Sequence, residues 1–172
     1  MHEFYSWVES LAFSTWIRES GSLWSYPIVL TLHTMGLAIL VGFNWAVDFR
    51  LLGFGETVPL SSMAKYFPVM WFGFWINLFS GIILLMADAT TKMTSWVFGV
   101  KMIFIVIGMI VLRKIQVKVF HSIDQKDKLS YISPDAKVLA MVSLVCWVMA
   151  TTAGRLMAYL GPQVGLSGPQ IK

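Results

Sequence analysis

Three basic side chains lie within apolar stretches of this 172-residue chain, at similar depths from the ends of those stretches. His33 lies about seven residues after Tyr26, or ~10 Å along a helix that rises 1.5 Å per residue. Lys101 and Arg155 each lie about five residues inside the ends of two other apolar stretches. An imidazole with two cations slightly above it meets the needs of haem b, which are an axial nitrogen ligand, an apolar slot and cations for two propionates.

The predicted site comprises His33 as the iron ligand, Lys101 and Arg155 near the propionates, and Gly36 and Asn77 beside the histidine. Gly36 lies one turn after His33 on the same face, where the missing side chain leaves space for a porphyrin edge. The alternative interpretation is structural. In it, His33 hydrogen-bonds Asn77 or a backbone carbonyl between packed helices, while the two cations extend towards the membrane surface.

A second axial ligand is not evident, because neither of the other histidines lies inside an apolar stretch. His2 can fold back from the same side of the membrane, whereas His121 belongs to the opposite side. The site is therefore either open, which favours gas binding or oxygen chemistry, or closed, which favours electron transfer. The candidates for closing it, besides a neighbouring subunit, are Met35, Met70 and Met86.

Copper is a second cofactor to consider. His2 can bind cupric ion together with the terminal amine and the intervening amide, if the terminus is free. The chain has 11 methionines, but they are spread over all the apolar stretches without a clustered motif, which favours a packing role.

The composition predicts which elements position these residues. The chain is 57% hydrophobic and 13% charged, as expected for an integral membrane protein. The single cysteine, Cys146, excludes a disulfide framework and the C-x-x-C-H motif of a c-type cytochrome. No motif for nucleotide binding or soluble hydrolases is present, and nothing indicates nucleic-acid binding. We predict an all-α fold, in which one membrane domain (1–172) forms a four-helix bundle preceded by an N-terminal interfacial amphipathic helix. The predicted ranges are 3–19 for the interfacial helix and 26–48, 64–87, 96–119 and 136–160 for the spans.

The first span carries a polar stripe. At 100° per residue, His33, Gly36, Leu40, Asn44 and Asp48 fall on one side, so that side should face protein rather than lipid.

The end of this span is expected at Asp48-Phe49-Arg50, where a charged pair returns the chain to water. We interpret Asp48 and Arg50 as a topological anchor and a salt bridge, with a proton relay as the alternative.

In the second span, Gly73, Asn77 and Gly81 recur every fourth residue, a seam that lets helix backbones approach closely. The seam and the small extramembrane mass also favour a symmetric homo-oligomer. The segment after this span, DATTKMTS, reads as a turn.

Lys and Arg counts predict the orientation, since cytoplasmic loops carry an excess of both. Eight such residues lie on the side of the first–second and third–fourth loops and five on the other. Both termini are then outside the cytoplasm, as is the level of His33.

Four motifs carry a family resemblance: H-T-M-G, D-F-R-L-L-G, W-F-G-F-W-I-N-L-F-S-G and A-G-R-L-M-A-Y. Together they resemble a family of small four-helix proteins of the bacterial inner membrane, and more loosely the four-helix cytochromes b and the copper-resistance D proteins. The resemblance covers nearly the whole chain. It implies a membrane position and a haem, but no activity. The function predicted from the residues is that of a haem b protein in electron transfer or in oxygen and small-gas redox chemistry, with a redox partner or quinone. The other class of function is a non-haem module, meaning a small transporter, a copper-handling protein or an assembly subunit.

Overall fold

The computed structural model describes residues 7, 10, 26–120 and 133–160. In these ranges the regular structure is entirely helical, and four helices are long and apolar enough to cross a membrane. The predicted all-α four-helix membrane bundle is thus confirmed. The interfacial helix predicted over 3–19 lies outside the described residues, apart from Trp7 and Ser10. The long helices are α3 (Tyr26–Leu52), α4 (Tyr66–Ala87), α6 (Trp96–Ile115) and α8 (Pro134–Leu160). The short ones are the 3-10 helix η1 (Leu60–Met63), α5 (Ala89–Met93) and the π-helix η2 (Gln116–Phe120).

Each long helix differs from its predicted range by two to four residues at one end. α3 runs past Asp48 to Leu52, because Asp48 is buried in the bundle and does not return the chain to water. The segment predicted as a turn contains α5, so that prediction was wrong.

The start of α8 has the residues expected at a helix N-terminus. The backbone nitrogen of Ala136 donates to Ser133 Oγ (3.3 Å), and Pro134 occupies the first helical position, where its missing N–H has no cost.

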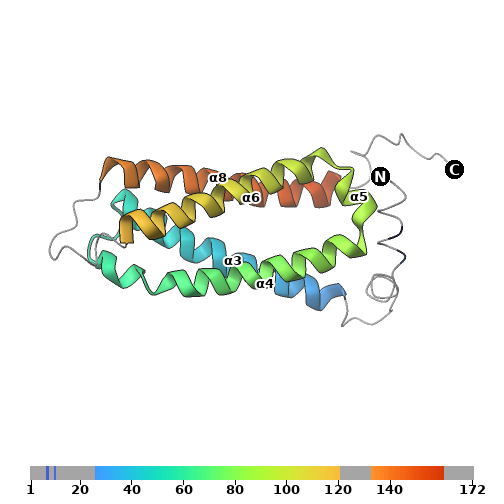
Figure 1. Cartoon of the computed structure of the whole chain (residues 1–172), viewed down its shortest axis with the longest axis horizontal. Helices are drawn as coiled ribbons and strands as arrows, with labels where there is room; N and C mark the ends of the chain where they lie inside the picture. Colours follow the sequence, from blue (N-terminus) through green and yellow to red (C-terminus); the bar gives the residue numbers. More distant parts are fainter. Residues whose placement is uncertain (1–6, 8–9, 11–25, 121–132, 161–172) are drawn as a thin grey trace.

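The four long helices form two pairs, α3 with α4 and α6 with α8 (Figure 1). Consecutive long helices run in opposite directions, so each end of the bundle gathers two helix starts and two helix ends. We call the end with the start of α3, the end of α8 and helix α5 the histidine end. The opposite end, with η1 and the start of α8, is the core end.

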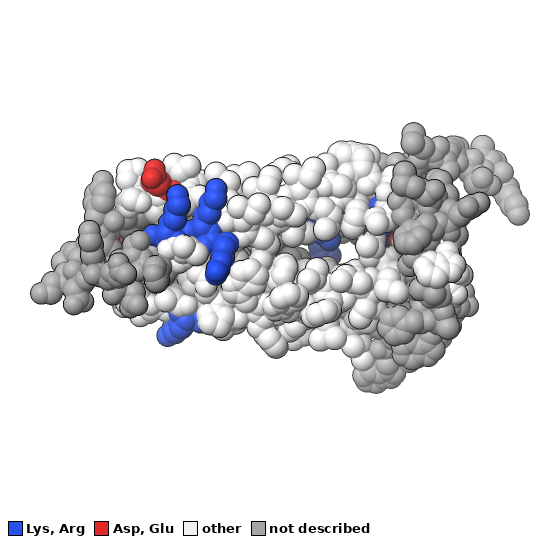
Figure 2. All heavy atoms as spheres, viewed as in Figure 1, with Lys and Arg blue, Asp and Glu red and all other residues white. Residues whose placement is uncertain are grey.

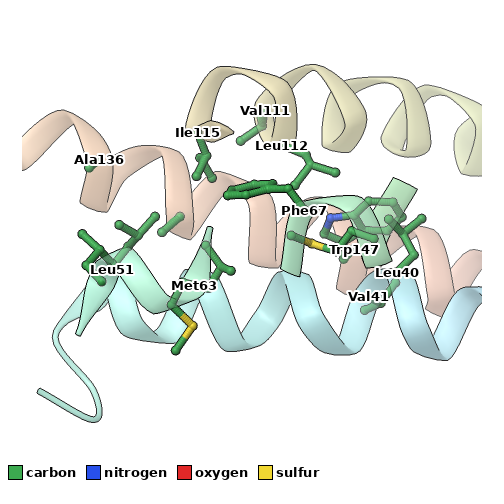
Figure 3. Close-up of a cluster of buried hydrophobic side chains, with 14 residues drawn as sticks. Leu40, Val41, Leu51, Met63, Phe67, Val111, Leu112, Ile115, Ala136 and Trp147 are labelled. Carbon is green, nitrogen blue, oxygen red and sulfur yellow. The ribbon is translucent and has the colours of Figure 1, made fainter. Parts of the chain in front are cut away.

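The hydrophobic core lies in the half of the bundle next to the core end. Figure 3 shows Phe67 of α4 next to Leu112 and Ile115 of α6, with Leu51 of α3 and Ala136 of α8 further towards the end. Trp147 marks the other limit of this cluster. It is 1% exposed, and its indole lies 3.3 Å from the position that a Cβ would take on Gly108. Burial of these side chains holds all four long helices together here.

The half next to the histidine end is filled differently. None of the residues from 98 to 107 on α6 is buried. The buried residues of the long helices in this half are Gly36, Ser80, Leu84, Ala87, Val97, Ala150 and Ala153. Apart from Leu84 and Val97, all of them are glycine, alanine or serine. The interior at this end is thus lined by small residues and not by a packed core.

Candidate functional site

The imidazole of His33 lies in the half of the bundle that has few large buried side chains, two turns after α3 begins. Its Nδ1 atom is 3.1 Å from the backbone oxygen of Asn77 and 3.1 Å from Ser80 Oγ on α4. A carbonyl oxygen only accepts, so the bond to Asn77 assigns the hydrogen to Nδ1. The Ser80 hydroxyl donates to the carbonyl oxygen of Ile76 (2.6 Å). Within the described ranges Nε2 makes no hydrogen bond, and its lone pair is available to a ligand.

Glycine at position 81 makes room for this ring. A Cβ on Gly81 would lie 3.1 Å from His33 Cε1, so any larger residue would press on the imidazole. In return, the Asn77 side chain donates from Nδ2 to the backbone oxygen of His33 (2.8 Å). The hydrogen bond of the ring and the hydrogen bond of the backbone therefore both hold His33 against α4.

Close approach of α3 and α4 depends on two glycines. A Cβ on Gly36 would lie 2.8 Å from the Asn77 nitrogen and 2.9 Å from the Gly73 oxygen, and a Cβ on Gly73 would lie 2.9 Å from the Gly36 oxygen. The predicted close helix contact along Gly73, Asn77 and Gly81 is confirmed, and it is made with α3 of the same chain. The space beside Gly36 is filled by the backbone of α4 and is not a slot for a porphyrin edge. The seam packs α4 against α3 of the same chain, so it gives no support to a homo-oligomer.

Lys101 lies across from His33, on the other helix pair. Its half-buried side chain runs along Gly154 of α8, with Nζ 3.8 Å from the position of a glycine Cβ. It is close enough for its charge to act on the His33 ring. Figure 2 shows Lys or Arg atoms set back between the helices towards this end. The structure therefore places Lys101 within electrostatic range of His33, and its role beside a cofactor stays a prediction.

Lys92 of α5 is a member of this site that sequence analysis did not predict. Its Nζ donates to the carbonyl oxygen of Leu84 (2.7 Å), near the end of α4 where carbonyls lack helical partners. Its charge also acts on His33 and on Lys101. Burial lowers the pKa of the Lys92 amine, and the nearby charge of Asp88 opposes that effect. The only signal in the sequence was a lone cation next to the end of a span.

None of the other predicted residues that the structure describes hydrogen-bonds to His33, and two of them lie outside the described ranges. Arg155 follows Gly154 directly but is exposed. Met35 is 55% exposed, and Met70 is fully buried in the core cluster. Met86 is half-buried near the end of α4. The predictions for His2 and His121 fall on residues that are not described.

A second polar cluster lies towards the core end. Asn44, Asp48 and Ser143 are each 0% exposed. Asn44 Nδ2 donates to Asp48 Oδ2 (2.6 Å) and to Ser143 Oγ (2.7 Å), which joins α3 to α8. The oxygens Asn44 Oδ1 and Asp48 Oδ1 are buried and have no partner among the described atoms.

The salt bridge predicted between Asp48 and Arg50 is wrong. Arg50 donates from Nε to the carbonyl oxygen of Val58 (2.7 Å) and from a terminal nitrogen to that of Glu56 (3.5 Å), so it fastens the loop after α3. Two residues apart on a helix, the two side chains point about 200° apart, which separates acid from base.

Within the described residues, no group of three His, Cys, Asp or Glu side chains is placed to hold a metal ion. An axial haem ligand, by contrast, requires only one histidine from the chain. Comparison with protein-family models, curated proteins and solved structures finds no match for this chain. The resemblance drawn from the four motifs therefore stays a prediction.

Proposed function

We propose that the protein is a membrane-embedded haem b protein in which His33 is the axial ligand, acting in electron transfer or in oxygen and small-gas redox chemistry. The observation that carries the proposal is the state of the His33 ring, with Nδ1 hydrogen-bonded to Asn77 and Nε2 free. Histidines that ligate metals usually donate the other ring hydrogen in this way, which fixes both tautomer and orientation.

The surroundings of His33 fit a flat, apolar group. Small buried residues such as Ala150 and Ala153 line this half of the bundle, and no residue from 98 to 107 is buried. A bound haem would supply an iron centre that exchanges one electron or binds a diatomic gas. The chain would hold the ring, exclude water and shape the distal side.

The two lysines fit the carboxylates of such a group. Lys101 and Lys92 are half-buried cations near His33, and charge-assisted bonds to carboxylates are stronger than neutral ones. We assign the propionates to this pair first, because the exposed Arg155 reaches them only by folding back along α8.

The proposed location is the inner membrane of a bacterium, with both termini in the periplasm. Figure 2 shows Lys and Arg side chains gathered at the core end, where the excess of cations supports a cytoplasmic side. The exposed basic residues at the core end include Lys65, Arg113, Lys114, Lys118 and Lys137. Single cysteines at Ser130 and Ser167 test this topology in intact cells. An impermeant reagent that labels Ser130→Cys but not Ser167→Cys contradicts it.

The partners proposed with this function are the lipid bilayer, a redox protein or quinone, and further copies of the chain. Native mass spectrometry from mild detergent tests the last of these. A purely monomeric spectrum contradicts the homo-oligomer.

The test of the haem proposal is an absorption spectrum of protein expressed with adequate haem supply. We expect a Soret band that is absent in His33→Ala and retained in His121→Ala, the matched control from the loop that is predicted to lie on the opposite side. A wild-type spectrum without a Soret band contradicts the proposal, and the non-haem module then takes its place. A normal spectrum from His33→Ala shows that another residue is the ligand.

A further inference from the structure

The cluster of Asn44, Asp48 and Ser143 is separate from the histidine site, and the proposed function does not use it. Asp48 is fully buried, one turn before the end of α3 at the core end. An ionisable group held within a membrane span is expensive and is commonly a functional site.

The charge on Asp48 would have no counter-charge in the described part of the chain. The side chains that act on its carboxyl group are those of Asn44 and Ser143, and neither is charged. The nearest cation along the helix, Arg50, is bonded to the following loop. An ionised carboxylate that is buried with one oxygen unpaired would carry a penalty of several kcal/mol, which a neutral carboxylic acid avoids.

The hydrogen bonds of this cluster leave one carboxyl oxygen over. Asn44 Nδ2 lies 2.6 Å from Asp48 Oδ2 and 2.7 Å from Ser143 Oγ, so the two amide hydrogens are donated to these two oxygens. The other carboxyl oxygen, Asp48 Oδ1, is buried without a partner among the described atoms. A proton on the carboxyl group removes the negative charge that would otherwise be shared with this unpaired oxygen.

We propose that this cluster is a proton-binding site in which Asp48 holds a proton as a neutral carboxylic acid, with Asn44 and Ser143 as its hydrogen-bond partners. Asp48 lies about 6 Å along the helix axis from the end of α3, so the proton is exchanged with water at the core end. A buried carboxyl group that gains and loses a proton is the element from which membrane proteins build proton relays.

The experiment is an infrared spectrum of the purified protein in lipid. We expect the carbonyl stretching band of a protonated carboxylic acid in neutral buffer, shifted in D2O and absent in Asp48→Asn. The matched control is Asp135→Asn, which removes an exposed carboxylate from the first turn of α8 and should leave the band in place. Ser143→Ala should keep the band but move it, because the carboxyl group loses a neighbour.

Two results overturn the proposal: no such band in the wild-type protein, or an unchanged band in Asp48→Asn. If Asp48→Asn does not fold, the test uses the wild-type protein alone. The carboxylic acid band should then weaken as the buffer is made more alkaline. A wild-type protein that lacks the band and unfolds at higher temperature in sodium than in choline salts would have a metal cation as the counter-charge, which also overturns it.

Discussion

His33 and Asn77 are joined by two hydrogen bonds that run in opposite directions between α3 and α4. The ring nitrogen Nδ1 donates to the backbone oxygen of Asn77 (3.1 Å), and the Asn77 amide donates to the backbone oxygen of His33 (2.8 Å). Each residue thus uses both its side chain and its backbone, so the ring orientation and the helix register are fixed by the same contact.

Asn77→Ala removes the amide donor but keeps the carbonyl that holds the ring. We expect the free energy of unfolding to fall by about 1 kcal/mol, the usual value for one interhelical hydrogen bond. Reversible unfolding in mixed micelles measures it. Thr34→Ala is the control, because that exposed hydroxyl bonds only to its own helix. Equal stabilities of Asn77→Ala and wild type would contradict the prediction.

Gly36→Ala should destabilise the bundle by about 1–3 kcal/mol, because the new methyl group overlaps the backbone of α4 and the helices must separate. Gly42→Ala on the same helix has no atom within 4 Å of the new methyl group. Alanine is the better helix former by about 1 kcal/mol, so this variant should equal or exceed the wild type. The same unfolding assay compares them, and similar losses in both variants would rule out close helix contact as the reason.

Lys101→Gln should weaken haem binding about tenfold, the effect of losing one charge-assisted hydrogen bond of about 1.5 kcal/mol. Arg155→Gln should change it less, because Arg155 is exposed whereas Lys101 is half-buried near His33. Titration of apoprotein with haem, followed at the Soret band, gives both affinities. A larger loss of haem affinity in Arg155→Gln than in Lys101→Gln would contradict the prediction and indicate that the propionates lie beside Arg155.

The stability of the wild-type protein should rise with pH on the alkaline side because of Lys92. Burial lowers the pKa of its amine in the folded state below the usual 10.5. Between these two values the unfolded chain binds more protons than the folded one, so stability increases with pH across this window. Lys92→Gln should flatten that rise in an unfolding series at increasing pH, and Lys65→Gln, an exposed control, should not. An unchanged slope in Lys92→Gln would contradict the assignment.

The fold could be predicted from sequence because it depends on local properties. Apolar length identifies each span, and the 100° rotation per residue placed Gly36, Leu40, Asn44 and Asp48 on one buried side, as observed. The same rotation also shows why Asp48 cannot pair with Arg50. The closeness of two charges in the sequence was therefore a weaker predictor of a salt bridge than their positions around the helix.

The site could be predicted only in part. His33 and Asn77 were recognised as polar residues within spans, but Lys92 and Ser143 reach their clusters through contacts between helices that are distant in sequence. No periodicity specifies which residue of α8 faces Asn44. Gly36 shows the same limit, since a missing side chain serves a cofactor or a neighbouring helix equally well.

The uneven distribution of large side chains also has a mechanical consequence. The two helix pairs are joined firmly at the core end, while the small residues at the other end leave them weakly attached to each other. We therefore expect the two pairs to separate more easily beside His33 than at the core end. Local opening should therefore begin beside the histidine and require much less free energy than unfolding the whole bundle.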